Sequence, residues 1–101
     1  MDSTIKPTFV ASALSLLKER LDRMPEDTTR DDYFTARIEQ TIGEMERQGI
    51  TLTESVDDLM LVVDGAAWNH ANRDKQSGMP EWLRRKVIAR WLNNHKQEVE
   101  A

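Results

Sequence analysis

VDDLMLVVDGAAWNHANR, the segment at residues 56–73, holds the longest uninterrupted apolar run of the chain, from Leu59 to Val63. Its apolar side chains recur at helical spacing on one broad face: Val56, Leu59, Met60, Val63, Ala66 and Ala67. Leu61 and Val62 widen that face. A helix that is apolar around most of its circumference is usually packed on several sides, so this segment is predicted to be the central helix of the fold.

Two helices are predicted before the central one. Residues 9–24 carry an apolar stripe formed by Val10, Leu14, Leu17, Leu21 and Met24. Thr8 is the expected N-cap of this helix and Pro25 its expected stop. Residues 30–48 carry a second stripe formed by Phe34, Ile38, Ile42 and Met45. Gly49 follows it, where a residue with positive φ is expected after a helix.

A fourth helix is predicted at residues 80–94, with Pro80 at its first position. Leu83, Val87 and Trp91 form its inner stripe, with Ile88 and Leu92 beside that stripe. Residues 50–53 are expected to form an extended linker whose apolar side chains pack against the core, because the sequence offers no obvious partner strand. Residues 74–79 are expected to form a mobile loop. The sequence therefore predicts an all-α, four-helix domain spanning 1–101, with a flexible leader at 1–8 and a frayed tail at 95–101.

Paired acids are found at two predicted helix starts. Ser55 with Asp58 has the spacing of a capping box, and Asp57 suits the positive end of the helix dipole. Asp31 and Asp32 repeat this arrangement, each three residues after a threonine, Thr28 or Thr29. We interpret both pairs as helix-capping residues and not as catalytic carboxylates.

The remaining residue types give no support for an enzyme, a metal or a cofactor. The chain has no cysteine and only 4 glycines, without a glycine-rich phosphate loop or a Gly-x-Ser-x-Gly motif. Its two histidines, His70 and His95, lie at the ends of different predicted helices, without metal-ligand spacing. No apolar run approaches the ~20 residues that span a bilayer, so a soluble protein without membrane contact is expected.

The net charge of −4 conceals an asymmetry between two parts of the chain. Residues 1–72 hold 7 Lys or Arg against 14 Asp or Glu, whereas residues 73–96 hold 7 against 2. An acidic body and a basic last helix are complementary, which favours association between copies of the chain. We expect Trp82, Arg84, Arg85 and Arg90 to make contacts with a neighbouring subunit or partner. Their expected acidic counterparts are Asp31, Asp32, Glu39 and Glu46 of that neighbour.

Several segments resemble the small phage head–tail connector proteins, also called head-completion or adaptor proteins. They are LLKERL at 16–21, DDYF at 31–34, RIEQTI at 37–42, DDLMLVVDGAAW at 57–68, Arg73-Asp74 and GMPEWLR at 78–84. The resemblance implies a subunit of a ring at the portal vertex, made in the host cytoplasm and located in the virion. Its implied partners are the portal protein and a tail or stopper protein, with DNA passing through the channel without sequence-specific binding. The leader before Thr8 departs from the family pattern.

Two alternatives stay open. A small phage or prophage regulator would bind DNA through the basic fourth helix, with arginines on phosphates. The chain's overall acidity and the long predicted loop before this helix weigh against it. The other alternative is a bacterial helical adaptor. Neither the subunit number nor the face used by each partner follows from the sequence.

Overall fold

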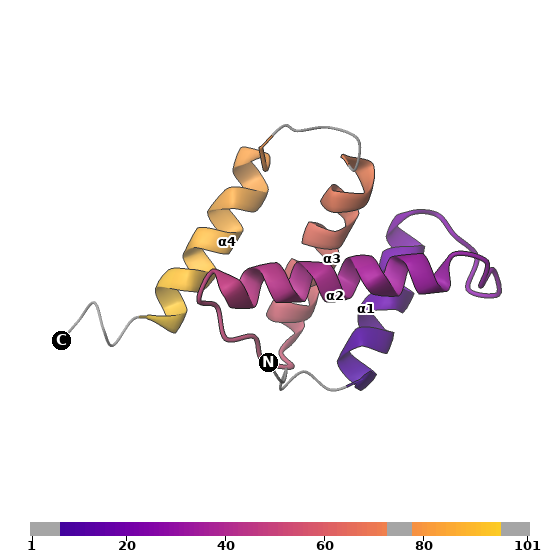
Figure 1. Ribbon diagram of the computed structural model, residues 1–101, viewed down its shortest axis with the longest axis horizontal. Coiled ribbons are helices and arrows are strands. Elements are labelled where there is room, and N and C mark those ends of the chain that lie inside the picture. Colours follow the sequence, from indigo (N-terminus) through magenta and orange to yellow (C-terminus); the bar gives the residue numbers. More distant parts are fainter. Residues whose placement is uncertain (1–6, 73–77, 96–101) are drawn as a thin grey trace.

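The computed structural model describes residues 7–72 and 78–95. Within those ranges it holds four helices and no strand: α1 (Pro7–Arg20), α2 (Asp31–Arg47), α3 (Val56–Ala71) and α4 (Glu81–Asn94). The all-α, four-helix fold predicted from the sequence is confirmed. In Figure 1, α2 crosses in front of α3 and α1, and α4 lies on the side of α3 away from α1.

The prediction of a central third helix is also confirmed, because α3 packs against α1, α2 and α4. Seven consecutive residues of α3, from Leu61 to Ala67, are buried. The axes of α2 and α3 approach closely at Gly65, where an added Cβ would lie only 2.8 Å from Cγ2 of Thr41. Glycine is therefore required at this contact for steric reasons. Val56, which was expected on the buried face, is instead 73% exposed at the first turn.

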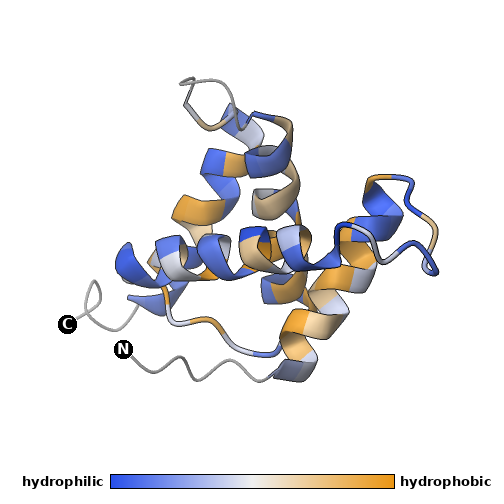
Figure 2. Cartoon of the chain, turned by 45° about the vertical axis from the view of Figure 1, so that its right-hand side comes forward, coloured by the Kyte–Doolittle hydropathy of each residue, from blue (hydrophilic) through white to orange (hydrophobic). Residues whose placement is uncertain are grey.

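The apolar core is contributed mainly by the first three helices and by the linker between α2 and α3. Its buried members are Phe9, Ala13, Leu17, Phe34, Ile38, Ile42, Met45, Ile50, Leu52, Leu61, Val62, Val63, Ala66, Ala67, Leu83 and Val87. Ile50 and Leu52 confirm that the linker packs its apolar side chains inward. Figure 2 shows the contrast between α1, which is largely hydrophobic over its first turns, and α2, whose visible side is mainly hydrophilic.

The first helix differs from its predicted bounds at both ends. It begins at Pro7, so Pro7 and Thr8 belong to the helix, and residues 1–6 of the predicted leader lie outside the described part of the chain. It ends at Arg20, because Asp22 adopts a left-handed conformation with φ of 58° and turns the chain four residues earlier than expected. Met24 is consequently 66% exposed instead of completing the apolar stripe.

The other helix ends agree with the sequence to within two residues, but the caps differ. Gly49 has the expected positive φ, 94°, after α2. The threonine capping boxes before α2 do not form: Arg30 is the N-cap, without a side-chain cap, and Thr29 instead bonds to Asp27. Ser55 caps α3 through the Asp58 N–H as predicted, whereas the Asp58 carboxylate turns to other partners. Pro80 is the N-cap residue of α4, one position before its predicted place.

Of the predicted mobile loop at 74–79, residues 74–77 lie outside the described part of the chain, and Met79 packs against the core. Of the predicted tail, His95 directly follows α4 and residues 96–101 lie outside the described part.

Candidate functional site

The fourth helix has an unusually small apolar interface with the rest of the molecule. Only Leu83 and Val87 of its fourteen residues are buried. Large apolar side chains remain exposed along the same helix: Trp82 (45%), Ile88 (46%), Trp91 (36%) and Leu92 (50%). Trp68 of α3, in contrast, is half-buried against the core cluster. The exposed side of α4 is therefore the clearest candidate surface for binding another macromolecule.

Polar contacts provide much of what holds α4 in place, and the most buried of them centre on Asp58 at the start of α3. Arg90 donates from Nε to Asp58 Oδ1 at 2.6 Å and from Nη2 to Oδ2 at 3.0 Å. Thr53 donates to Asp58 Oδ2 from its backbone N–H and from its hydroxyl. The side chain of Asp58 is 1% exposed and that of Arg90 is 15% exposed. Four donated hydrogen bonds therefore satisfy a carboxylate that is nearly removed from solvent.

The electrostatics of this pair follow from its geometry. Burial raises the pKa of the Asp58 carboxyl, but the hydrogen bonds from Arg90 and Thr53 outweigh burial, so its pKa lies below the usual value of 3.8. The hydrogen bond to Asp58 raises the pKa of Arg90, although burial acts in the opposite direction. Both groups are charged at neutral pH, and the charge of each is neutralised inside the protein by the charge of the other.

A second acid of α3, Asp64, binds cations from two helices at once. Its Oδ1 atom pairs with Arg20 at the end of α1, and its Oδ2 atom lies 2.9 Å from Lys86 Nζ on α4. The Asp64 side chain is 8% exposed, whereas those of Arg20 and Lys86 are 39% and 55% exposed. Asp64 therefore links α1, α3 and α4 through one carboxylate at the edge of the core.

The last two turns of α4 also bind the linker that precedes α3. Arg90 donates to the carbonyl oxygen of Thr51 at 2.8 Å, and the Thr51 N–H donates to Asn94 Oδ1 at 2.7 Å. Trp91 and His95 stack on one another with ring centroids 4.1 Å apart, and both rings lie against Gly49. The backbone of residues 49–53 is thus fixed between the start of α3 and the end of α4.

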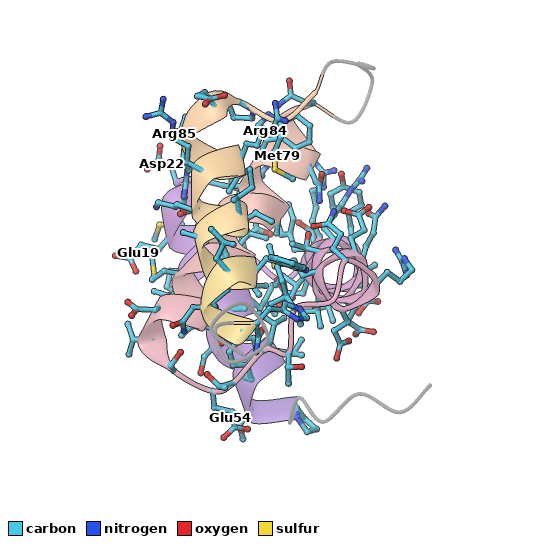
Figure 3. All side chains as sticks on the ribbon, turned by 90° about the vertical axis from the view of Figure 1, so that its left-hand side faces the viewer. Glu19, Asp22, Glu54, Met79, Arg84 and Arg85 are labelled. Carbon is cyan, nitrogen blue, oxygen red and sulfur yellow. The ribbon has the colours of Figure 1, made fainter. Side chains whose placement is uncertain are left out.

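The four predicted contact residues occupy different environments. Trp82, Arg84 and Arg85 are exposed, and Figure 3 shows Arg84 beside Met79 and Arg85 on the other side of the same end of α4. Arg85 pairs with Glu81 one turn earlier. Arg90 is the exception, because its guanidinium is engaged inside the subunit by Asp58 and by Thr51. The part of Arg90 that was expected to meet an acidic neighbour is therefore already paired with an acid of its own chain.

Of the expected acidic counterparts, Asp31 is also engaged internally, with Oδ1 3.0 Å from Nζ of the buried Lys18. Asp32 and Glu39 are exposed, and Glu46 is half-exposed. Sequence reasoning missed Ile88 and Leu92 as surface residues, because it placed them beside the inner stripe. It also missed Asp64, although a single acid between Val63 and Gly65 in an otherwise apolar run is a signal of a buried ion pair.

No metal site or membrane-crossing segment was found in the residues that the structure describes. No group of three or more His, Asp or Glu side chains could hold a metal ion within 7–72 and 78–95. None of the helices in these ranges is both long enough and apolar enough to cross a bilayer. No family model matches the chain, and no curated protein or solved structure is significantly similar to it.

Proposed function

We propose that this protein is a non-enzymatic structural subunit that assembles with copies of itself into a ring, of the kind that joins a phage head to its tail. The observation that carries the proposal is the number of large apolar side chains that α4 exposes, of which Ile88 and Leu92 share one side of the helix. Trp82, Ile88, Trp91 and Leu92 are large side chains that a helix presents to solvent at a cost, unless another surface covers them. The sequence resemblance to head–tail connectors gives this association its biological setting, with portal and tail or stopper proteins as further partners.

The regulator alternative is less well supported, because two of the basic residues of α4 are already used within the subunit. Lys86 is paired with Asp64, and Arg90 is paired with Asp58. Arg84 is the remaining cation of α4 that has no ion pair within the described residues, since Arg85 is paired with Glu81. Specific DNA binding ordinarily uses several phosphate contacts, so a helix with so few available cations is a weak candidate.

Light scattering on a size-exclusion column, over a concentration series and combined with negative-stain microscopy, tests the proposal. We expect oligomers that grow with concentration and annular particles at the highest concentrations. Ile88→Ser together with Leu92→Ser should shift the distribution toward monomer. The matched control is Met24→Ser together with Val56→Ser, which changes two still more exposed apolar residues that are not part of α4 and should leave assembly unchanged.

Two results would overturn the proposal. A monomer at every concentration would exclude a ring-forming subunit. Tight, sequence-selective binding of duplex DNA at physiological salt would instead support the regulator, and reversal of Arg84 and Arg85 to Glu would then abolish that binding.

A further inference from the structure

A shallow groove of about 480 Å³ separates the start of α1 from the middle of α2. We call it the α1–α2 groove; its lining is Pro7, Val10, Thr35, Glu39, Ile42, Gly43 and Glu46. Val10 and Ile42 contribute apolar side chains to this lining, and Glu39 and Glu46 contribute two carboxylates seven residues apart on α2. The groove can receive several side chains, because a cavity of about 150 Å³ already holds benzene.

Gly43 in this groove has no evident role within the subunit. Glycine destabilises a helix interior relative to alanine, so a glycine there ordinarily serves a close contact. Gly65 has such a contact, since a Cβ would clash with Thr41 at 2.8 Å. An added Cβ at Gly43 would meet only the flexible end of Arg47, with Nη1 at 3.3 Å. Because Gly43 lines the groove, the space that its missing side chain leaves belongs to the groove, which indicates that the close contact comes from outside the subunit.

The charge of the groove defines what kind of surface fits it. Neither Glu39 nor Glu46 takes part in an ion pair within residues 7–72 and 78–95. A complementary surface would therefore carry aliphatic side chains at its centre and a cation near its end.

The exposed side of α4 has this composition. Arg84, Ile88 and Leu92 are spaced by four residues, so they form one ridge along the helix, which we call the α4 ridge. All three are exposed, and Arg84 has no ion pair among the described residues. A ridge at four-residue spacing is the surface that packs into a groove between ridges of another helix. The ridge therefore matches the groove in apolar character and in charge.

The two surfaces also lie on opposite flanks of α2, so one subunit can use both at once. Thr41, Glu44 and Gln48 line the flank of α2 that faces α3 and α4. Thr35, Glu39, Gly43 and Glu46 line the other flank, toward α1. A contact between two different surfaces of identical subunits is head-to-tail, and such contacts generate rings when the rotation closes.

We infer that the α4 ridge of one subunit occupies the α1–α2 groove of the next, with an aliphatic side chain over Gly43 and Arg84 against Glu39 or Glu46. This inference rests on the proposed self-assembly and adds the identity of the receiving surface. It assigns Gly43 the role of keeping that surface open.

Substitution at Gly43 separates this role from a role in folding. Gly43→Leu should fill the groove and weaken self-association by roughly tenfold or more, as occlusion of a central contact does. The thermal midpoint of the dilute subunit should stay unchanged or rise, because leucine favours a helix more than glycine does. Ser12→Leu is the matched control, since Ser12 is exposed and its position two residues after Val10 places it on the other side of α1 from the groove. Its enlargement should not affect assembly.

Charge reversal identifies the occupant. Arg84→Glu and the double change Glu39→Arg with Glu46→Arg should each weaken assembly, because like charges then meet across the contact. Combining the two sets should restore a large part of the association. Glu19→Arg makes a change of the same sign on an exposed residue outside the groove, and assembly should not change.

The outcomes distinguish this inference from the proposed function. If Gly43→Leu and the reversed groove assemble as well as the parent, the groove is not the receiving surface, although ring formation stands. If the groove variants weaken assembly but Arg84→Glu does not, and the combination restores nothing, a different occupant uses the groove and the inference fails. A parent protein that stays monomeric overturns both.

Discussion

The α1–α2–α3 core and the α3–α4 junction are stabilised by different interactions. In the core, large apolar side chains from three helices and the linker are buried together, among them Leu17, Phe34 and Ile38. At the junction, Leu83 and Val87 are the buried side chains of α4, and polar side chains complete the contact through Asp58 and Asp64 of α3. The core should therefore tolerate changes in pH and salt that loosen α4, and the following substitutions test that difference.

The largest effect is expected in the core. Phe34→Ala removes a ring that is 2% exposed and should lower the free energy of unfolding by about 4 kcal/mol, through lost burial and the cavity left behind. Urea unfolding followed by circular dichroism measures this value. Met24→Ala, at a residue that is 66% exposed, should change it by less than about 0.5 kcal/mol. Equal effects at the two positions would contradict the assignment of the core.

An intermediate effect is expected at the junction. Arg90→Ala leaves the Asp58 carboxylate buried without its cation and should cost about 3 kcal/mol. Lys86→Ala should cost less than about 1 kcal/mol, because Lys86 is half-exposed and Arg20 still compensates Asp64. Urea unfolding measures the loss of stability in each variant, and hydrogen exchange of the α4 amides shows whether this helix is loosened. If α4 exchanges no faster in Arg90→Ala than in Lys86→Ala, Asp58 does not hold the helix.

The smallest effect is expected from pH. The pKa of Asp58 is lower in the folded chain than its ordinary value of 3.8, so its ionisation stabilises the fold above that value. This contribution is lost as the pH falls through the lowered folded pKa, while Arg90 stays charged throughout. Thermal midpoints measured between pH 6 and pH 2 should therefore fall on acidification.

Asp58→Asn is the control for this pH dependence. Asp27 also has a lowered pKa, caused by hydrogen bonds from Thr29, and it titrates in both proteins. In the variant, the thermal midpoint should fall less on acidification, because the contribution of Asp58 is gone and the contributions of the other acids remain. If the thermal midpoint depends on pH in the same way in the parent and in Asp58→Asn, Asp58 does not contribute to the acid sensitivity of the fold.

The same contrast explains which features could be predicted from the sequence. Apolar periodicity is a local property, and it identified four helices, the central α3 and the inward position of Ile50. The end of α1 was missed because nothing in the sequence around Asp22 announces its positive φ. The Arg90–Asp58 pair joins residues 32 positions apart, and Lys86–Asp64 joins residues 22 apart. Helical spacing carries no information about such partners, so the basic face of α4 looked more available than it is.

The candidate surface was predicted in part. Composition singled out Trp82, Arg84 and Arg85, and all three are exposed. Ile88 and Leu92 were assigned to the flank of the inner stripe, and only the narrow contact between α3 and α4 reveals that they face solvent. The α1–α2 groove was not foreseen as a groove, although two of its lining residues, Glu39 and Glu46, had been named as acidic counterparts. A glycine in the middle of an otherwise regular helix, Gly43, was the overlooked signal.

The close approach of α2 and α3 at Gly65 has an evolutionary consequence. Alanine at this position would meet the methyl group of Thr41, whose hydroxyl is needed because it donates to the Arg37 carbonyl and accepts from Asn69. Serine at position 41 would keep the hydroxyl and remove the methyl. Descendants of this sequence can therefore reach alanine at 65 most easily after serine has appeared at 41, and the order of the two substitutions matters more than either one alone.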